Sequence, residues 1–166
     1  PPVGRISENP GTKSIVCESE IISLVYSIFN KLKFDDFEIK LNNRKILLGI
    51  SEELNFKNKF EKFCILIDKI DKIGVSGLKK EMKLNKFPIS SIKKLISLLE
   101  LKGNNSSKIN YVKTFLSNSK IGLEGISEIE NLMKIKSDFT LDFTLARGLS
   151  YYTSTIFEVV PTNNNI

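Results

Sequence analysis

The 166-residue sequence contains no histidine, and this absence narrows the chemistry available to it. Without histidine the chain cannot build a Ser-His-Asp triad or a Cys-His dyad, and it lacks the commonest metal ligand. Its two cysteines, Cys17 and Cys64, are too few for a disulfide framework or a zinc site. A single disulfide between them stays open, although we prefer reduced thiols in an intracellular protein. Any chemistry must therefore rest on arginine, lysine, carboxylates, hydroxyls or backbone groups.

The sequence also lacks a long apolar run. No stretch approaches the roughly 20 residues needed to span a bilayer, so we expect no membrane association. The segment Pro1 to Arg5 has neither an apolar signal region nor a start methionine, and we interpret it as the edge of a longer chain rather than a targeting signal. Hydrophobic residues make up 41% and charged residues 27% of the chain, which indicates a folded core rather than disorder.

The positive charge is concentrated in one region. Residues 55–113 contain 14 lysines against five acidic residues, a net charge of +9, whereas the whole chain carries +6. A basic stretch of this kind suits a polyanion such as RNA. Lysines are also ordinary on solvated helix faces in a chain as rich in Lys, Asn and Ile as this one, so charge alone leaves both interpretations open.

Hydrophobic periodicity predicts an α+β fold in which a helical block is inserted between sheet elements. Residues 4–14 have the composition of a loop, and residues 17–33 show helical spacing. Alternating apolar and polar residues predict a half-buried strand over 34–42. Residues 44–54 return to helical spacing, and the pattern then stays helical over 56–136.

The period changes again after Lys136. Residues 139–145 alternate between apolar and polar, and residues 152–160 are rich in Thr, Tyr, Ile, Phe and Val. We expect these two segments to be strands that are joined through 147–150 and form an antiparallel pair. Within the helical block, Gly103 to Ser107 is predicted to be a turn.

The segment between these two predicted strands gathers groups that suit an anionic ligand. Residues 145–153 read Leu-Ala-Arg-Gly-Leu-Ser-Tyr-Tyr-Thr. Arg147 offers a planar, permanently charged fork for carboxylate or phosphate, and Gly148 lets a ligand approach the backbone closely. Tyr151 and Tyr152 offer an aromatic wall with hydroxyls at its rim. The same residues also fit a turn with an ion-paired surface arginine, so the chemistry alone does not decide in favour of a site.

This segment closely resembles the histidine-recognition motif of histidyl-tRNA synthetases, which reads roughly L-A/V-R-G-L-D-Y-Y-T-G in that family. The following Ile156 to Glu158 is similar to the family's next strand. Upstream, residues 36–47 resemble a strand-and-helix segment of the type F-x-I-K-V-N-x-R-K-I-L, and residues 67–72 resemble the D-K-L-D-K stretch that opens a helical insertion. Glu18 to Glu20 stands where the family often has D-A-E. These ordered matches cover nearly the whole chain.

The resemblance implies part of the antiparallel sheet of a class II synthetase with a mostly helical insertion. Residues 1–54 would belong to the catalytic domain, 55–135 to the insertion domain, and 136–166 to the catalytic-domain strands that carry the histidine-recognition motif. The parent enzyme would activate histidine with ATP and magnesium to histidyl-adenylate and transfer it to tRNA(His). The resemblance further implies a homodimer in the cytoplasm or, alternatively, in an organelle.

By the same resemblance, Arg147 is the catalytic arginine, which contacts the histidine carboxylate and the α-phosphate where negative charge accumulates. Tyr151 and Tyr152 would line the pocket for the histidine side chain, and Gly148 would let the backbone pass close to the ligand. No metal ligand is expected in this chain. The insertion over 55–135 would lie near the acceptor stem of the tRNA, in agreement with the lysine-rich stretch.

The chain departs from the family pattern in several places. Ser150 replaces the usual aspartate and Ser154 a common glycine, while Glu158 and Thr153 are expected at most behind the residues that touch the ligand. The three class II motifs and the anticodon-binding domain have no counterpart, so we expect this fragment to be inactive by itself. The alternative is a non-catalytic synthetase-like module that senses RNA or binds a partner. Ser150 favours the module, whereas Arg147 and the paired tyrosines favour an active parent enzyme.

Overall fold

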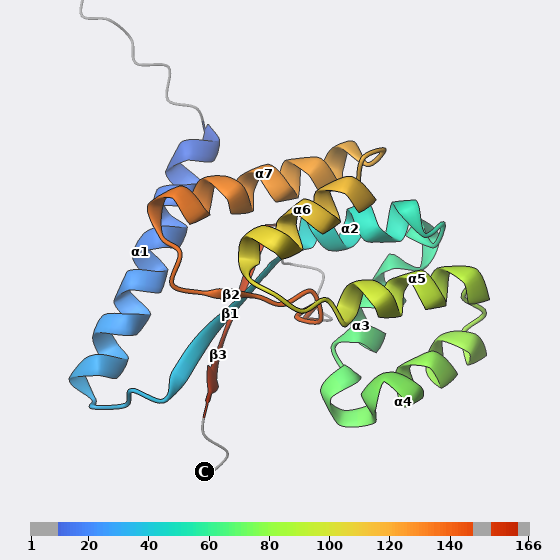
Figure 1. Ribbon diagram of the computed structural model, residues 1–166, viewed down its shortest axis with the longest axis horizontal. Coiled ribbons are helices and arrows are strands. Elements are labelled where there is room, and N and C mark those ends of the chain that lie inside the picture. The colour runs from blue at the N-terminus through green and yellow to red at the C-terminus, as the bar shows by residue number, and fades with distance from the viewer. Residues whose placement is uncertain (1–9, 148–153, 163–166) are drawn as a thin grey trace, which may run out of the picture.

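A computed structural model of the protein describes residues 10–147 and 154–162, which form a small sheet surrounded by helices (Figure 1). The α+β class expected from the sequence is confirmed. The elements follow in the order α1 (Pro10–Lys31), β1 (Phe37–Asn43), α2 (Arg44–Glu53), the 3-10 turn η1 (Lys57–Lys59), α3 (Phe60–Ile67), α4 (Ile70–Leu84), α5 (Ile89–Leu99), α6 (Asn105–Phe115), α7 (Lys120–Ile135), β2 (Thr140–Leu141) and β3 (Thr155–Pro161).

The central strand of the sheet is β1, and the strand order is β2-β1-β3. β3 pairs with β1 antiparallel along its whole length, from Phe37 opposite Pro161 to Asn43 opposite Thr155. β2 pairs with β1 parallel, with Lys40 opposite Thr140. The sheet is therefore mixed, and its first strand in sequence separates the two that come last.

The expected antiparallel pair between residues 139–145 and 152–160 is wrong. Within 139–145 only Thr140–Leu141 (β2) is a strand, and it lies on the opposite edge of β1 from β3. The alternation over 139–145 is real, because Phe139, Leu141, Phe143 and Leu145 are all buried. Beyond Leu141, however, the chain turns, and the Leu145 backbone N–H donates to the Asp142 carbonyl at 3.1 Å. Alternate residues over 139–145 are therefore buried although most of this segment is a turn rather than a strand.

Aromatic side chains of α1 cover the start of β1. Phe29 and Tyr26 approach Phe37 with ring centroids 4.6 and 5.1 Å apart, respectively. The Tyr26 hydroxyl also donates to the Asp138 carbonyl at 3.0 Å, which joins α1 to the segment before β2. Figure 1 shows α1 along one side of the sheet, with α7 crossing above it.

Two element starts differ from the sequence-based expectation. The first helix begins at Pro10 rather than near Cys17, and proline suits a first helical turn because no partner is needed for its missing N–H. The expected turn over 103–107 is shorter, because α6 begins at Asn105, with the Asn104 side chain accepting a hydrogen bond from the Ser107 N–H at 2.9 Å. Within the described residues, no helix is both long and apolar enough to cross a membrane.

The helices α3, α4 and α5 form a block at the far end of the molecule from α1 (Figure 1). The predicted helical character over 56–136 is confirmed. Phe56 ties the block to α2, because its ring lies 4.9 Å from that of Phe63 and 5.2 Å from that of Phe87 between centroids. Cys64 is buried beside them, and burial raises the pKa of its thiol to about 12. Cys17 is exposed, and both thiols are free.

The helices α2 and α7 touch at three glycines, Gly49 of α2 and Gly122 and Gly125 of α7. A Cβ atom on Gly49 would lie only 2.6 Å from the Gly122 Cα and 3.0 Å from the Ser119 Oγ. One turn along, a Cβ on Gly125 would lie 2.9 Å from the Ile46 backbone nitrogen. Contacts below about 3 Å are not tolerated in close-packed interiors, so glycine lets the two helix backbones meet here. This contact places α7 against the end of β1.

We predict that Gly49→Ala lowers the free energy of unfolding of the chain by about 1–3 kcal/mol, because the added methyl group overpacks the contact with Gly122. At an unobstructed helix position the same change would stabilise by about 1 kcal/mol, so the sign of the effect reports the contact. Urea denaturation measures it. Ser127→Ala, at an exposed position of α7, is the control and should change stability by less than about 0.5 kcal/mol.

Candidate functional site

Arg147 follows the turn after β2 and faces β3. Its Nη2 atom lies 2.5 Å from the Glu158 Oε1 atom, and the two side chains are 40% and 34% exposed. Both groups are thus paired yet open to solvent on one side. Of the predicted site residues, Gly148, Tyr151 and Tyr152 lie outside the described residues, so only Arg147 is placed here. Glu158, expected at most behind the ligand-contacting residues, is the direct partner of this arginine.

The turn that delivers Arg147 is built around Asp142. The Asp142 Oδ1 atom accepts hydrogen bonds from the Thr144 N–H at 2.9 Å and the Thr144 hydroxyl, and its Oδ2 atom lies 3.0 Å from the Lys40 Nζ atom. Burial alone would raise the pKa of Asp142, but these hydrogen bonds and the lysine outweigh burial and lower it below its ordinary value. The carboxylate therefore stays charged at neutral pH and holds the turn against β1.

A cleft of about 270 Å³ opens beside Arg147. It lies where the sheet meets the junction of α3 and α4, and charged side chains of both signs line it. The charged lining residues are Lys40, Asp68, Asp71, Lys72, Asp142, Arg147 and Glu158. A cleft of mixed charge suits a zwitterion better than an apolar ligand, because each charge of the ligand finds an opposite partner.

Residues at the junction between β1 and α2 form hydrogen bonds to the segment that leads to Arg147. Asn42 and Asn43 are fully buried, and the Asn42 Nδ2 atom donates to the Leu145 carbonyl at 2.9 Å. The Asn43 Oδ1 atom caps α2 by accepting from the Lys45 N–H at 2.9 Å, while its Nδ2 atom donates to Glu128 of α7 at 2.7 Å. The sequence alone predicted no contact for these residues, although two polar residues at the end of a buried strand were the available signal.

Glu128 joins three elements. Besides Asn43, its carboxylate accepts hydrogen bonds from the Lys45 Nζ atom at 2.6 Å and the Ser154 hydroxyl at 3.0 Å. Burial works to raise the pKa of Glu128, but these three donors prevail and lower it. Ser154, which replaces a common glycine of the family pattern, therefore has a defined contact with α7.

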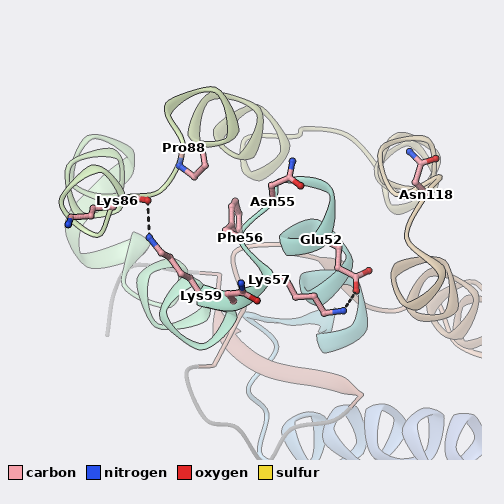
Figure 2. A pocket seen from close by; sticks show the side chains of 9 residues that line it. Glu52, Asn55, Phe56, Lys57, Lys59, Lys86, Pro88 and Asn118 are labelled. Carbon is pink, nitrogen blue, oxygen red and sulfur yellow. Dashed lines mark hydrogen bonds and ion pairs between the residues drawn. The ribbon is translucent and has the colours of Figure 1, made fainter.

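A larger hollow, of about 690 Å³, lies away from Arg147 between α2, η1 and the start of α5 (Figure 2). Two of the three lysines that line it, Lys57 and Lys59, already have partners. The Lys59 Nζ atom donates to the Asn85 and Lys86 carbonyls, both at 2.8 Å, and the Lys57 Nζ atom lies 2.6 Å from the Glu52 Oε1 atom. These lysines hold the end of α4 and the turn after α2, so we place the candidate site at the smaller cleft beside Arg147.

Comparison with known proteins identifies relatives along nearly the whole chain. Residues 7–165 match the family described as histidyl-tRNA synthetase. A protein of Cytophaga hutchinsonii named histidine–tRNA ligase is 40% identical over 156 residues, which is 90% of this chain and 34% of that protein. A protein of Phocaeicola vulgatus with the same name is 39% identical over 155 residues, again 90% of this chain and 34% of the relative. The chain thus spans about a third of the length of these relatives.

Solved structures share the fold. The crystal structure of histidyl-tRNA synthetase from Nostoc sp. PCC 7120 superimposes with a TM-score of 0.82 at 25% identity, over 89% of this chain and 37% of that one. An ATP phosphoribosyltransferase regulatory subunit/histidyl-tRNA synthetase from Bacillus halodurans gives a TM-score of 0.74 at 15% identity, over 92% of this chain and 41% of that one, and shows likeness of fold alone.

We predict that Asp142→Asn lowers the free energy of unfolding at pH 7 by about 1–3 kcal/mol, because the charged hydrogen bonds to Thr144 and Lys40 are weakened. Since the folded pKa of Asp142 is lowered, its contribution is complete above the unfolded pKa of about 3.9 and disappears as the pH falls through the folded value. The variant should therefore lose less stability than the wild type between about pH 5 and pH 2.

Urea denaturation across this pH range measures the difference. Asp138→Asn is the matched control, because Asp138 forms an ion pair with Lys136 but its side chain is 55% exposed. Exposed pairs contribute at most about 1 kcal/mol, so this control should change stability little at pH 7. Equal losses in the two variants, or parallel pH curves for Asp142→Asn and the wild type, would contradict the assigned role of Asp142.

Proposed function

We propose that this chain, which belongs to the histidyl-tRNA synthetase family, is the part of a histidine–tRNA ligase that contributes Arg147 to the amino-acid site. The intact protein activates histidine with ATP to histidyl-adenylate and then transfers the histidyl group to tRNA(His). The observation that carries the proposal is Arg147, held by Glu158 at the rim of a charged cleft within the motif typical of the family. With about a third of the relatives' length, the chain alone is inactive.

In this proposal Arg147 stabilises negative charge in the transition state and transfers no proton. A carboxylate oxygen of histidine attacks the α-phosphorus of ATP, the bond to the β-phosphate breaks, and pyrophosphate leaves. Negative charge accumulates on the α-phosphate oxygens during this exchange. A guanidinium held in place by Glu158 stabilises that charge without reorganising at the moment of reaction. Its 40% exposure leaves the guanidinium reachable from the cleft.

The remaining predicted site residues complete the pocket in this proposal. Tyr151 and Tyr152 contact the histidine side chain, and Gly148 lets the backbone approach the ligand. The exposed carboxylates of Asp68 and Asp71, which line the same cleft as Arg147, are available to the ammonium group of the amino acid. Among the residues that the structure describes, no group of three acidic, cysteine or histidine side chains is arranged to hold a metal ion. Magnesium accompanies ATP in the proposal.

We also propose the division of the chain into catalytic-domain residues 1–54 and 136–166 and an insertion over 55–135. The intact protein is a homodimer of the cytoplasm in this proposal, with an organelle as the alternative. Similarity to proteins named as ligases does not favour the other candidate, a non-catalytic module that senses RNA or binds a partner.

The basic surface of α4 and α5 is the proposed contact with tRNA. Five of the six lysines in these two helices are exposed, lie outside the lining of the cleft beside Arg147 and form no ion pair with an acidic side chain in the described part of the chain; they are Lys79, Lys80, Lys83, Lys93 and Lys94. Uncompensated lysines suit a phosphate backbone, because binding releases the counterions of the nucleic acid.

In the intact protein, Arg147→Ala should lower histidine-dependent ATP–pyrophosphate exchange by about 10²–10³-fold, because the charge that stabilises the transition state is removed. The thermal unfolding midpoint should change little, since the pair with Glu158 is partly exposed. Lys113→Ala is the control: it removes a cation from an exposed ion pair with Glu130 and should leave exchange unchanged. Near-normal exchange in Arg147→Ala would overturn the assignment, and absence of exchange in the wild type would favour the non-catalytic module.

A charge-reversal pair separates tRNA binding from adenylate formation. Lys79→Glu with Lys83→Glu, one turn apart on α4, should weaken binding of tRNA(His) by about tenfold or more while exchange changes less than about twofold. The control is Lys31→Glu with Lys33→Glu, which makes the same change in net charge where α1 ends, at the opposite end of the molecule. Equal weakening in both pairs would show a general charge effect and contradict a contact at α4.

A further inference from the structure

Arg44, the first residue of α2, has an unusual position for an arginine. It is only 7% exposed, and its guanidinium lies 4.9 Å from the centre of the Phe60 ring. Its Nη2 atom donates to both carboxylate oxygens of Glu61, at 3.1 and 3.3 Å. A buried arginine needs partners for its charge and its donors, and Glu61 and Phe60 supply part of them. These contacts hold the guanidinium in one orientation.

The remaining contacts of Arg44 reach the two sides of the histidine-recognition motif. Its Nη1 atom donates to the Arg147 carbonyl at 3.4 Å, and its backbone N–H donates to the Ser154 carbonyl at 2.9 Å. One residue at the β1–α2 junction therefore binds the last described residue before 148–153 and the first one after it. No other described residue donates to both of these carbonyls.

The hydrogen bond to the Arg147 carbonyl acts on a residue whose backbone conformation is strained. Arg147 has a φ of +41°, in the left-handed region that side chains other than glycine rarely adopt. Such a conformation persists only where surrounding contacts hold it. Arg44 supplies one of these contacts at the backbone, and Glu158 supplies another at the side chain. The direction of the Arg147 guanidinium follows from both, because the side chain starts from the backbone that Arg44 holds.

We propose that Arg44 is a positioning residue for Arg147: the fork of Arg44, oriented by Glu61, holds the strained backbone of Arg147 so that its guanidinium faces the cleft. Arg44 itself touches no reacting group and acts through Arg147. The inference rests on the proposed function, since it assumes that Arg147 stabilises charge during adenylate formation. Small misplacement of such a group costs up to about 100-fold in rate.

A double-mutant cycle in the intact protein tests this inference. The variants are Arg44→Met, Arg147→Ala and the two combined, and methionine is chosen because it keeps apolar contact with Phe60. Histidine-dependent ATP–pyrophosphate exchange is measured per active site, with active sites counted by titration of bound adenylate. Arg44→Met should lower the rate per site by about 10–100-fold, and the double variant should be no more than about threefold slower than Arg147→Ala.

Non-additivity of this kind separates positioning from a general structural role. Loss of folded protein would lower the number of titrated sites and leave the rate per site unchanged, which would overturn the proposal. Two effects that multiply in the double variant would also overturn it, because Arg44 would then act independently of Arg147. If Arg44→Met does not fold, Arg44→Lys replaces it in the same cycle. Lysine keeps the charge beside Glu61 but lacks the second arm that reaches the Arg147 carbonyl.

Failure of this inference is distinguishable from failure of the proposed function. An intact wild-type protein without histidine-dependent exchange overturns the proposed function and this inference with it. An active wild-type protein in which Arg147→Ala is slow but Arg44→Met is normal per site overturns the inference alone. Lys113→Met, which removes a cation from an exposed ion pair, is the control for loss of positive charge and should retain the wild-type rate.

Discussion

The arrangement of the site depends on three consecutive polar residues that are buried where β1 runs into α2. Asn42, Asn43 and Arg44 cannot be solvated there, so each must find hydrogen-bond partners within the protein. Those partners come from distant parts of the chain, namely Leu145 and Arg147 before residues 148–153, Ser154 after them, and Glu128 of α7. The hydrogen bonds of these three residues thereby hold β1 against α7 and against the segments that follow β2 and precede β3.

Charged side chains at the surface of the cleft are also paired with one another. Arg147 is paired with Glu158, and both side chains are partly exposed. Their mutual attraction is therefore weakened by water. Glu158 in turn lies opposite Lys40 across the sheet, and Lys40 pairs with Asp142. Alternating charges of this kind hold the arginine in place and still leave it available.

Much of the fold could be predicted from the sequence because burial repeats locally. The alternation around Ile39 identified β1, and helical spacing identified the block over 56–136, since both patterns record which side of an element is buried. The same rule failed over 139–145, where alternate side chains are buried along a turn and only two residues form a strand. The partners of a strand could not be predicted either, because pairing depends on residues far away in the sequence.

By itself the sequence determined the classes of chemistry open to the protein and its family membership, because both depend on residue identity and order. The lack of histidine, the basic stretch and the motif that contains Arg147 needed no coordinates. The tertiary structure alone decided that β1 separates β2 from β3, that Glu158 faces Arg147, and that Arg44 reaches the Arg147 carbonyl across 103 residues of sequence. Such contacts leave no local pattern, since they join residues that are far apart in the sequence.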